Sequence, residues 1–522
     1  MQSKKWVYYI SIMLVIILAV GISGCGSSTT STTTTTTSTT TEQSKYGGTL
    51  RILTGGMGAG NIGIPWEIQQ NGDVIYPGLD RLINIDYDGI TQGLATDWVI
   101  ADDGKSVTFT LRQGVKFQDG TTFDAEAEKW NLDQWMAAHQ EGTETWTSVE
   151  VINEYTIRIN MTEYQNSTLT GLAGGYCGPI SPTAYEQNGH DWAEKNPCGT
   201  GPFKLVNINP DVGWKWERNE EYWQPGKPFL DAIEYEVFTD LNVAKMKMEN
   251  GEANVLITTS GATDVKVALQ DAGFVLVPYG AGGEAIGMLP DALNPDSPWS
   301  KKEVRLAADY ALNKEDLASL GRGMGEPSYQ VAPPGVSYYD PTLGRHYDTG
   351  KAQELLQQAG YGTGFDTVLN YTSDTFPTDF ALAIQSYFAD VGIRMELNLL
   401  PPAAAFGVVT QGWQNGLLGI PVQSPVNFPA EMEKMYGSHR ILFVSSLTTP
   451  ELQELIDQGL RTTSLEEQNQ WSAQINKYMY DEAVVIPFYM SLYYAVKTPS
   501  VHDDNIGIMS YFWTPADVWL SK

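Results

Sequence analysis

The chain has 522 residues, 42% of them hydrophobic, and its 62 acidic side chains outnumber its 32 basic ones to give a net charge of −30. This balance excludes a nucleic-acid partner, because such a partner requires a basic surface. The part after residue 45 is long enough for two or three domains of ~150 residues, and its charge favours a globular surface protein that repulsion keeps from aggregating.

The first 24 residues have the pattern of a secretory signal peptide. Lys4 and Lys5 precede an apolar run that ends near Val20, and small residues follow. This order is typical of an export signal that is later removed. A spanning helix needs about 20 apolar residues, more than the run offers. We therefore predict a signal peptide over residues 1–24, with an ordinary secreted protein or an uncleaved anchor as the alternatives.

Cys25 follows the small residues and resembles the cysteine of a bacterial or archaeal lipobox, which is lipidated and becomes the first mature residue. A Ser/Thr run from Ser27 to Thr41 comes next. Such a run cannot bury a core, so we expect residues 25–45 to be a disordered linker. Two or more acyl chains would anchor it firmly. We predict a lipoprotein at the outer face of the cytoplasmic membrane or in the periplasm.

Strand-like segments are frequent in the first half of the remaining chain. Residues 48–53, 107–111 and 155–159 are expected to form strands, the second because its residues alternate between apolar and polar. Residues 124–136 form an amphipathic pattern that predicts a helix.

Helical patterns dominate the second half. Helices are expected over four segments and strands over two, in the order 302–313, 352–359, 378–390, 392–397 (strand), 465–483 and 484–488 (strand). Strands and helices that mix throughout a chain favour α/β layers.

Cys177 and Cys198 remain when Cys25 is set aside. An even pair in an oxidising compartment predicts a disulfide, which would add roughly 3 kcal/mol on the loop-entropy model. The five histidines are widely spread and form none of the close pairs that zinc sites use. We therefore predict neither a metal site nor a cofactor.

Catalytic motifs are missing from the sequence. It contains no Gly-x-Ser-x-Gly elbow, no Walker loop and no His-Glu-x-x-His pattern. The acidic pair Asp102 and Asp103 precedes Gly104, which is typical of a solvated turn. The chain is therefore predicted not to be an enzyme. The alternative is an extracellular hydrolase, which would need two carboxylates at catalytic separation.

Residues 196–205, Asn-Pro-Cys-Gly-Thr-Gly-Pro-Phe-Lys-Leu, resemble the signature of the peptide/nickel-type substrate-binding proteins of ABC transporters, the bacterial extracellular solute-binding family 5. The resemblance extends from about residue 46 to 520. It includes further segments in the family's order, namely 94–98, 109–112, 116–121, 216–219, 222–223, 304–314 and 351–361.

The resemblance implies an α/β fold of the two-lobed periplasmic-binding-protein type II class, with an additional small lobe and a hinge between the lobes. The expected segments are 46–80, 177–275 and 489–522 for lobe I, 81–176 for the small lobe II, and 276–488 for lobe III. It also implies a monomer that traps a small ligand between the lobes and delivers it to ABC permease subunits. A sensory receptor with this fold is the alternative use.

The identity of the ligand stays open. Peptide-binding members hold the ligand's amino group with an aspartate, and the corresponding stretch here, residues 413–436, contains none. Glu284 could supply the missing carboxylate, since an ammonium group buried without one is costly. A peptide or amino compound, an oligosaccharide, and another solute such as a chelated metal are the three alternatives.

The resemblance and the residue types suggest a set of ligand-binding side chains. Aromatic side chains would wall the cleft, amides would orient the ligand, and Glu284 would bind any cation. The predicted residues are Asn61 and Trp66 from a Gly-rich loop, Glu284, Trp413, Gln423 and Asn427 from lobe III, and Trp513 from the returning segment.

Overall fold

The computed structural model describes residues 45–522 except 57–60, 68–74, 87–88, 175–176, 259–260, 281, 423–424, 439, 441, 504 and 507–512. The predicted signal peptide, Cys25 and all but the last residue of the predicted linker lie outside the described residues. So does Gln423. Residues Ser44–Lys522 form one compact unit.

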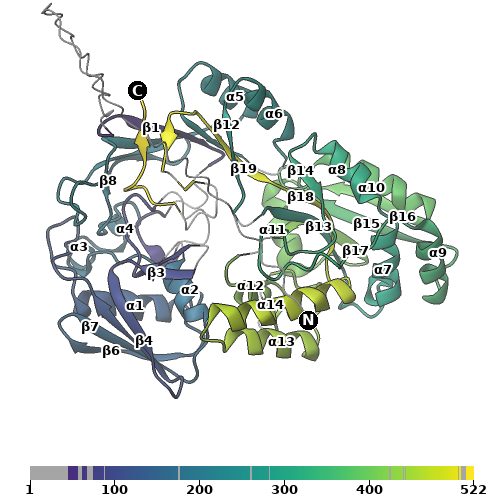
Figure 1. The fold of residues 1–522 in the computed structure, drawn as a ribbon, viewed down its shortest axis with the longest axis horizontal. Helices are drawn as coiled ribbons and strands as arrows, with labels where there is room; N and C mark the ends of the chain where they lie inside the picture. Colours follow the sequence, from purple (N-terminus) through teal and green to yellow (C-terminus); the bar gives the residue numbers. More distant parts are fainter. Residues whose placement is uncertain are drawn as a thin grey trace, which may run out of the picture. The chain divides into compact units, whose positions relative to one another are not determined.

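A mixed sheet of seven strands forms the first of two large layers in the described part of the chain (Figure 1). Strand β1 (Thr49–Thr54) lies inside it and is parallel to both neighbours. The sheet order is β12 (Val275–Pro278), β19 (Tyr493–Lys497), β11 (Val255–Ile257), β1, β10 (Ala232–Val237), β9 (Gly213–Arg218) and β8 (Phe203–Asn209). Helices α5 (Leu241–Glu249) and α6 (Thr263–Asp271) complete this layer.

A second mixed sheet contains six of the described strands, in the order β14 (Gly325–Pro327), β18 (Ile486–Ser491), β13 (Glu284–Pro290), β17 (Gly416–Val422), β15 (Phe365–Tyr371) and β16 (Ile393–Leu399). Every residue of β13 and β18 is buried, as expected for strands covered on both faces. The helices of this region are α7 (Lys302–Tyr310), α8 (Lys314–Leu320), α9 (Thr349–Gln358), α10 (Thr378–Asp390), α11 (Pro402–Gln411), α12 (Phe428–Tyr436), α13 (Pro450–Leu460) and α14 (Leu465–Asp481).

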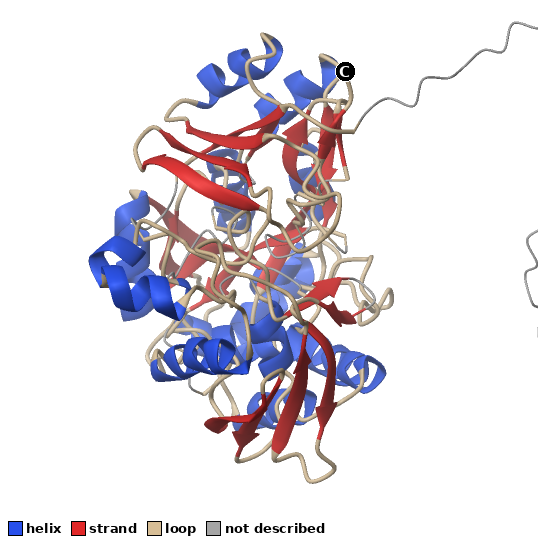
Figure 2. Cartoon of the chain, turned by 90° about the vertical axis from the view of Figure 1, so that its left-hand side faces the viewer, coloured by secondary structure: helices blue, strands red, loops and turns tan. Residues whose placement is uncertain are grey.

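A smaller antiparallel sheet is built from strands within residues 95–161. Its order is β4 (Ala95–Ile100), β5 (Ser106–Leu111), β7 (Thr156–Met161) and β6 (Trp146–Asn153). Helix α1 (Ala125–Ala137) packs against β6 and β7, and Asp124 caps it by accepting a hydrogen bond from the Ala127 N–H. Figure 2 looks at this side of the molecule, with these strands at its lower end.

Short elements complete the described structure. They are β2 (Ile83–Asp86) paired with β3 (Gly89–Gln92), β20 (Val501–His502) paired with β21 (Trp519–Leu520), helices α2 (Ser167–Ala173), α3 (Pro182–Asn188) and α4 (His190–Ala193), and 3-10 turns at Pro65–Glu67 and Pro298–Ser300. No helix within the described residues is long and apolar enough to cross a membrane.

The predicted elements agree closely with the observed ones. The helix predicted over 378–390 is α10 with the same bounds, and 465–483 becomes α14. The strand predicted over 484–488 is shifted to Ile486–Ser491 as β18. These segments carry strong local patterns, which is why periodicity alone located them.

Separate hydrophobic cores accompany the sheets. One core joins β1 and β10 to the small sheet through residues such as Ile52, Phe109 and Trp135, whereas Met288 and Phe380 belong to another around β13 and α10. The seven-stranded sheet draws on the three segments expected for lobe I, except that β12 crosses the expected boundary at residue 275. The exact lobe boundaries stay a prediction.

The structure corrects the predicted disulfide. Cys177 is buried and Cys198 is partly buried, and both are free thiols. The charge of Glu128 acts on Cys177, and that of Asp119 acts on Cys198. Burial raises the pKa of the Cys198 thiol to about 12, and it raises the pKa of Cys177 as well. Spacing in the chain shows that a loop could close, but a disulfide also needs Cβ atoms about 4 Å apart.

Candidate functional site

Two strand connections cross from one large sheet to the other, and they run side by side. One leads from β12 to β13 and the other from β18 to β19, where Leu492 is the single residue between the strands. The Tyr279 N–H donates to the Leu492 carbonyl at 2.8 Å. The two layers are therefore joined at a narrow crossing, which is the arrangement expected of a hinge.

Two glycines permit the close approach at this crossing. Gly282 and Gly283 have φ angles of +123° and +126°, a conformation that L side chains rarely adopt. A Cβ atom at Gly283 would lie 2.7 Å from the Met490 side chain and 2.8 Å from the Ser491 carbonyl oxygen. A side chain there would push the two connections apart.

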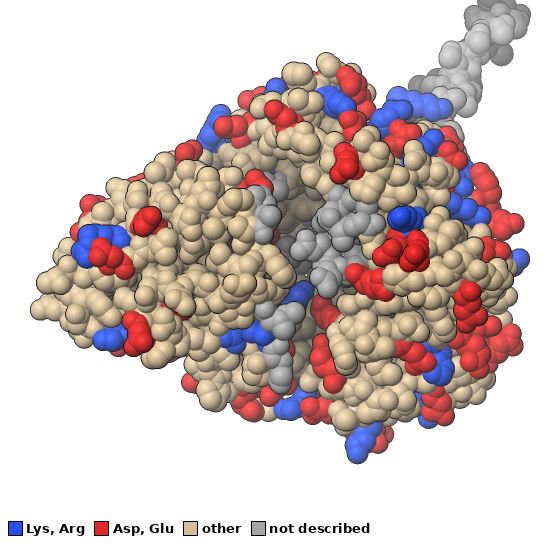
Figure 3. Space-filling view, turned by 180° about the vertical axis from the view of Figure 1, so that it is seen from behind, with Lys and Arg blue, Asp and Glu red and all other residues tan. Residues whose placement is uncertain are grey.

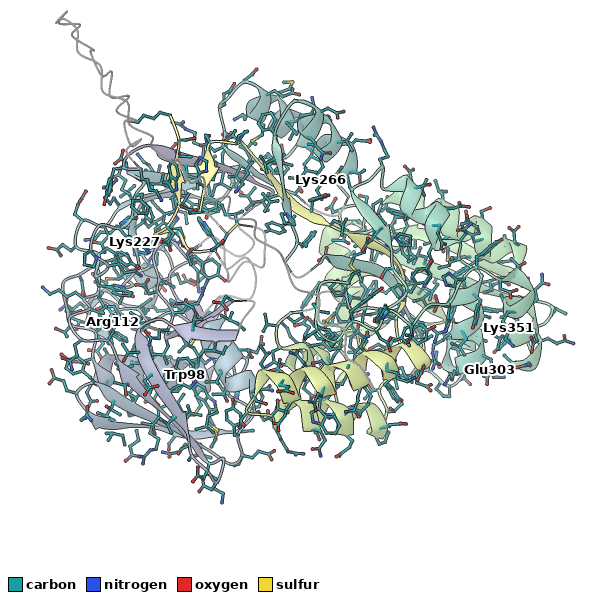
Figure 4. The ribbon with its side chains drawn as sticks, viewed as in Figure 1. Trp98, Arg112, Lys227, Lys266, Glu303 and Lys351 are labelled. Carbon is teal, nitrogen blue, oxygen red and sulfur yellow. The ribbon has the colours of Figure 1, made fainter. Side chains whose placement is uncertain are left out.

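A buried cation and a buried acid face this crossing. Lys266 of α6 is 1% exposed, and its Nζ donates to the Tyr493 carbonyl at 2.6 Å. Figure 4 shows Lys266 on α6 near β19. Burial lowers the pKa of Lys266 to about 8, although the charge of Glu284 opposes the shift. Glu284 is itself 5% exposed and opens β13 opposite Ser491. The crossing thus holds both signs of charge away from water.

A cavity lies beside Trp513, the predicted ligand-binding residue of the returning segment. It contains about 550 Å³ of space not filled by atoms, including space open to solvent, and Asp80, Arg81 and Trp223 help to line it. Asp80 accepts hydrogen bonds from Thr200, Tyr222 and Trp223 at 3.0, 2.8 and 2.7 Å.

The two charged side chains of this cavity, Asp80 and Arg81, differ in how they can interact with a ligand. Burial raises the pKa of Asp80 to about 6 against the opposing hydrogen bonds, and its carboxylate is already occupied by three donors. Arg81 stacks on the Tyr76 ring at 4.3 Å, and its buried Nε has no hydrogen-bond partner. The cavity therefore presents aromatic walls and a guanidinium group, which suit an anion or an apolar group.

Both predicted tryptophans outside this cavity are packed in cores. Trp66 is 7% exposed and lies edge-on to Trp130 at 5.5 Å. Trp413 is 2% exposed and belongs to the core that contains Met432 and Tyr436. These contacts are those of structural residues, and a ligand role for the two side chains stays a prediction.

The side chains of the two predicted amide residues that the structure describes, Asn61 and Asn427, are engaged in hydrogen bonds within the protein. Asn61 Oδ1 accepts from the N–H groups of Gly63 and Ile64, both at 3.0 Å, and so holds a turn. Asn427 caps α12 by accepting from the Ala430 N–H at 3.2 Å. The Asn427 amide donates to Asn166 Oδ1 at 2.9 Å and to Thr170 Oγ1 at 3.0 Å. Asn427 thus ties α12 to the segment around α2.

We expect Asn427→Ala to lower the free energy of unfolding by about 2 kcal/mol, because it removes a helix cap and leaves buried partners unsatisfied. Asn427→Ser keeps a capping hydroxyl and should lose about 1 kcal/mol. Urea unfolding of the two variants measures the difference. Unchanged stability in Asn427→Ala would contradict this structural role.

Sequence reasoning missed Asp80, Lys266 and a third group formed by Glu67, His190 and Glu194, whose ligand atoms all lie within 4.8 Å of one another. No recognised motif marks any of them, because Asp80, Lys266 and Glu67 each meet partners that are distant in the chain. Tyr222 and Trp223 carried part of the family resemblance but were not recognised as partners of Asp80.

Comparison with known proteins places these features in context. Residues 89–424 match the family model described as bacterial extracellular solute-binding proteins, family 5 Middle. The glutathione-binding protein GsiB of Salmonella paratyphi A is 31% identical over 318 residues, which are 59% of this chain and 60% of that protein. GsiB of Escherichia coli K12 is 31% identical over 323 residues. The chain thus spans about 60% of the length of these relatives.

Solved structures share the fold. DppA from Helicobacter pylori, in complex with the peptide STSA, aligns with a TM-score of 0.76 at 22% identity and covers 91% of this chain and 99% of its own. NikA from Brucella suis, in complex with Fe(III)-EDTA, aligns with a TM-score of 0.77 at 23% identity and covers 89% and 98%. The predicted class, an α/β periplasmic-binding-protein type II fold, is confirmed.

Proposed function

The chain belongs to family 5 of the bacterial extracellular solute-binding proteins, and from this premise we propose that it captures a small peptide or peptide-like solute for an ABC importer. We further propose that it is a monomer held at the outer face of the cytoplasmic membrane by a lipid on Cys25, and that it delivers its ligand to permease subunits. The relatives named as glutathione-binding proteins support the ligand class.

The observation that carries this proposal is the pairing of opposite charges at the crossing between the sheets. A peptide has an ammonium group and a carboxylate, so both signs of charge in one sheltered place suit it better than a neutral sugar. Glu284 is proposed to bind the ammonium group. Lys266 holds the crossing strand through Tyr493 and keeps a positive charge close to Glu284.

A ligand-binding function also accounts for the hinge-like crossing. A ligand that contacts both layers stabilises the closed conformation. The stabilisation equals the difference between the ligand's binding free energies for the open and the closed conformation. The family consists of binding proteins, so we expect ligand to be recovered chemically unchanged. Hydrolysis of a peptide or an oligosaccharide by the pure protein would contradict this.

A thermal-shift screen of the protein tests the proposal directly. Glutathione and short peptides should raise the melting temperature, because a ligand at 100 times its Kd adds about 2.7 kcal/mol of stability. Oligosaccharides and a ferric chelate such as Fe(III)-EDTA are the comparison ligands. A shift with a sugar or a chelate alone would overturn the peptide assignment.

We expect Glu284→Gln to weaken binding of the stabilising peptide by at least about tenfold, since a charge-assisted hydrogen bond contributes roughly 1.5–3 kcal/mol. Glu326→Gln is the matched control, because Glu326 lies on the strand β14 of the same sheet and is partly exposed. Calorimetric titration measures both affinities. Equal affinities in the two variants would show that Glu284 does not bind the ligand.

A further inference from the structure

The turn at Glu67 and the short helix α4 form a cluster of metal-ligating side chains. His190 Nε2 lies 2.9 Å and 3.1 Å from the two oxygens of the Glu67 carboxylate. Glu194 follows four residues after His190, which places both on one face of a helical turn. One ligand atom from each of the three side chains lies within 4.8 Å of the others.

We propose that Glu67, His190 and Glu194 bind one divalent transition-metal ion of the Zn²⁺ or Ni²⁺ kind. One imidazole nitrogen and two carboxylate oxygens form a donor set that these ions accept at about 2.0–2.2 Å. Donor atoms around such an ion are roughly 3–4 Å apart, so small side-chain rotations bring the three groups into place. Water would complete the coordination sphere.

The backbone around the cluster is held in place. The Glu194 carbonyl accepts from the N–H groups of Ile62 and Gly63 at 2.9 and 3.1 Å. A Cβ atom on Gly63 would lie 1.7 Å from the Ala193 carbonyl oxygen, so only glycine allows the turn to lie this close to α4. The backbone segments that carry the ligands are therefore held close together before an ion arrives.

Neighbouring polar groups are placed as outer partners of a metal site. The Asn61 amide donates to Glu67 Oε2 at 3.3 Å. His190 Nδ1 lies 3.7 Å from Asp191 Oδ1, so with Nε2 on the ion the Nδ1 proton can point toward a carboxylate. Outer carboxylates and amides of this kind orient metal ligands in proteins.

The charge of the region favours a cation. Among the described residues, no lysine or arginine is paired with Glu67 or Glu194, and the partner of Asp191 is His190. Acidic side chains are dense on the right-hand half of the face shown in Figure 3. The net charge of −30 attracts cations to the molecule, and a bound ion would link the turn at residues 61–67 to α4.

Calorimetric titration of the full-length chain with Zn²⁺, in the absence of any peptide, tests the proposal. We expect one ion per chain, with affinity at least about tenfold weaker in His190→Gln and in Glu194→Gln, a loss that even outer-shell changes produce. His346→Gln is the control, because His346 is exposed and lies 3.8 Å from Glu315, outside the proposed cluster. Circular dichroism verifies that each variant is folded.

The outcomes are distinct. A loss in both variants that His346→Gln does not share supports the site, whatever the peptide screen shows. Unchanged affinity in His190→Gln and Glu194→Gln, or no binding of Zn²⁺ or Ni²⁺ to the unaltered chain, overturns it. If His190→Gln does not fold, Glu67→Gln replaces it in the same comparison.

Discussion

Replacing Asp309 by asparagine is expected to lower the free energy of unfolding by about 3–5 kcal/mol, because it leaves buried cations without their counter-charge. Asp309 of α7 is 0% exposed. Its Oδ1 lies 2.6 Å from Lys314 Nζ, and its Oδ2 accepts from Arg345 Nη1 at 2.8 Å.

Burial explains why this cluster is so sensitive to the loss of one member. Lys314 is 0% exposed, and burial lowers its pKa while the Asp309 charge opposes that shift. The amide of asparagine cannot supply the opposing charge, so Lys314 and Arg345 would repel each other in a medium that screens weakly. The ring of Tyr329 lies 5.1 Å from Lys314 Nζ. Its attraction for the ammonium group would replace only a small part of the stabilisation that the Asp309 carboxylate provides.

Urea unfolding of Asp309→Asn measures the loss. The control is Glu354→Gln, which breaks the exposed pair of Lys351 and Glu354 and should cost less than about 1 kcal/mol. A loss below 1 kcal/mol in Asp309→Asn as well would show that the cluster contributes no more than a surface ion pair.

Replacing Glu128 by glutamine is expected to stabilise the protein by an amount that grows as the pH rises. Glu128 of α1 is 1% exposed, and its Oε2 has no hydrogen-bond partner. Burial raises the pKa of Glu128 to about 8 from an ordinary value of 4.5. The folded protein therefore holds the proton more tightly than the unfolded chain does.

The direction of the pH effect follows from proton linkage. A raised carboxyl pKa gives stability that is fully present below pH 4.5 and is lost as the pH rises toward about 8. The loss over that window is on the order of 5 kcal/mol. Glutamine resembles the protonated acid and has no proton to lose, so the variant and the parent should be similar near pH 4.5 and diverge above it.

Unfolding curves at several pH values between about 4.5 and 9 test this expectation. Asp80, with its pKa of about 6, acts in the same direction, so the difference between parent and variant isolates Glu128. Glu126→Gln is the matched control, because Glu126 is an exposed residue in the first turn of the same helix. Parallel pH profiles for the parent and Glu128→Gln would contradict the assignment.

The proposed metal site and the proposed solute site differ in how they can be found. The family resemblance rests on short segments whose order in the chain can be read directly. The metal cluster joins His190 to Glu67, 123 positions away, and no histidine pair or motif announces it. The prediction of no metal site considered only His and Cys pairs that are close in sequence, whereas the proposed site would join side chains from two separate segments.

The sequence by itself determined the α/β class, the positions of elements such as α10 and β18, and the family, because periodicity and short motifs are properties of neighbouring residues. Tertiary structure alone decided which side chains meet. It packed Trp66 and Trp413 into cores, left Cys177 and Cys198 as free thiols, and brought Lys266 to the strand crossing. Exposure and contact depend on segments far apart in the chain, so local sequence could name the residue types for a site but could not say which of them would face it.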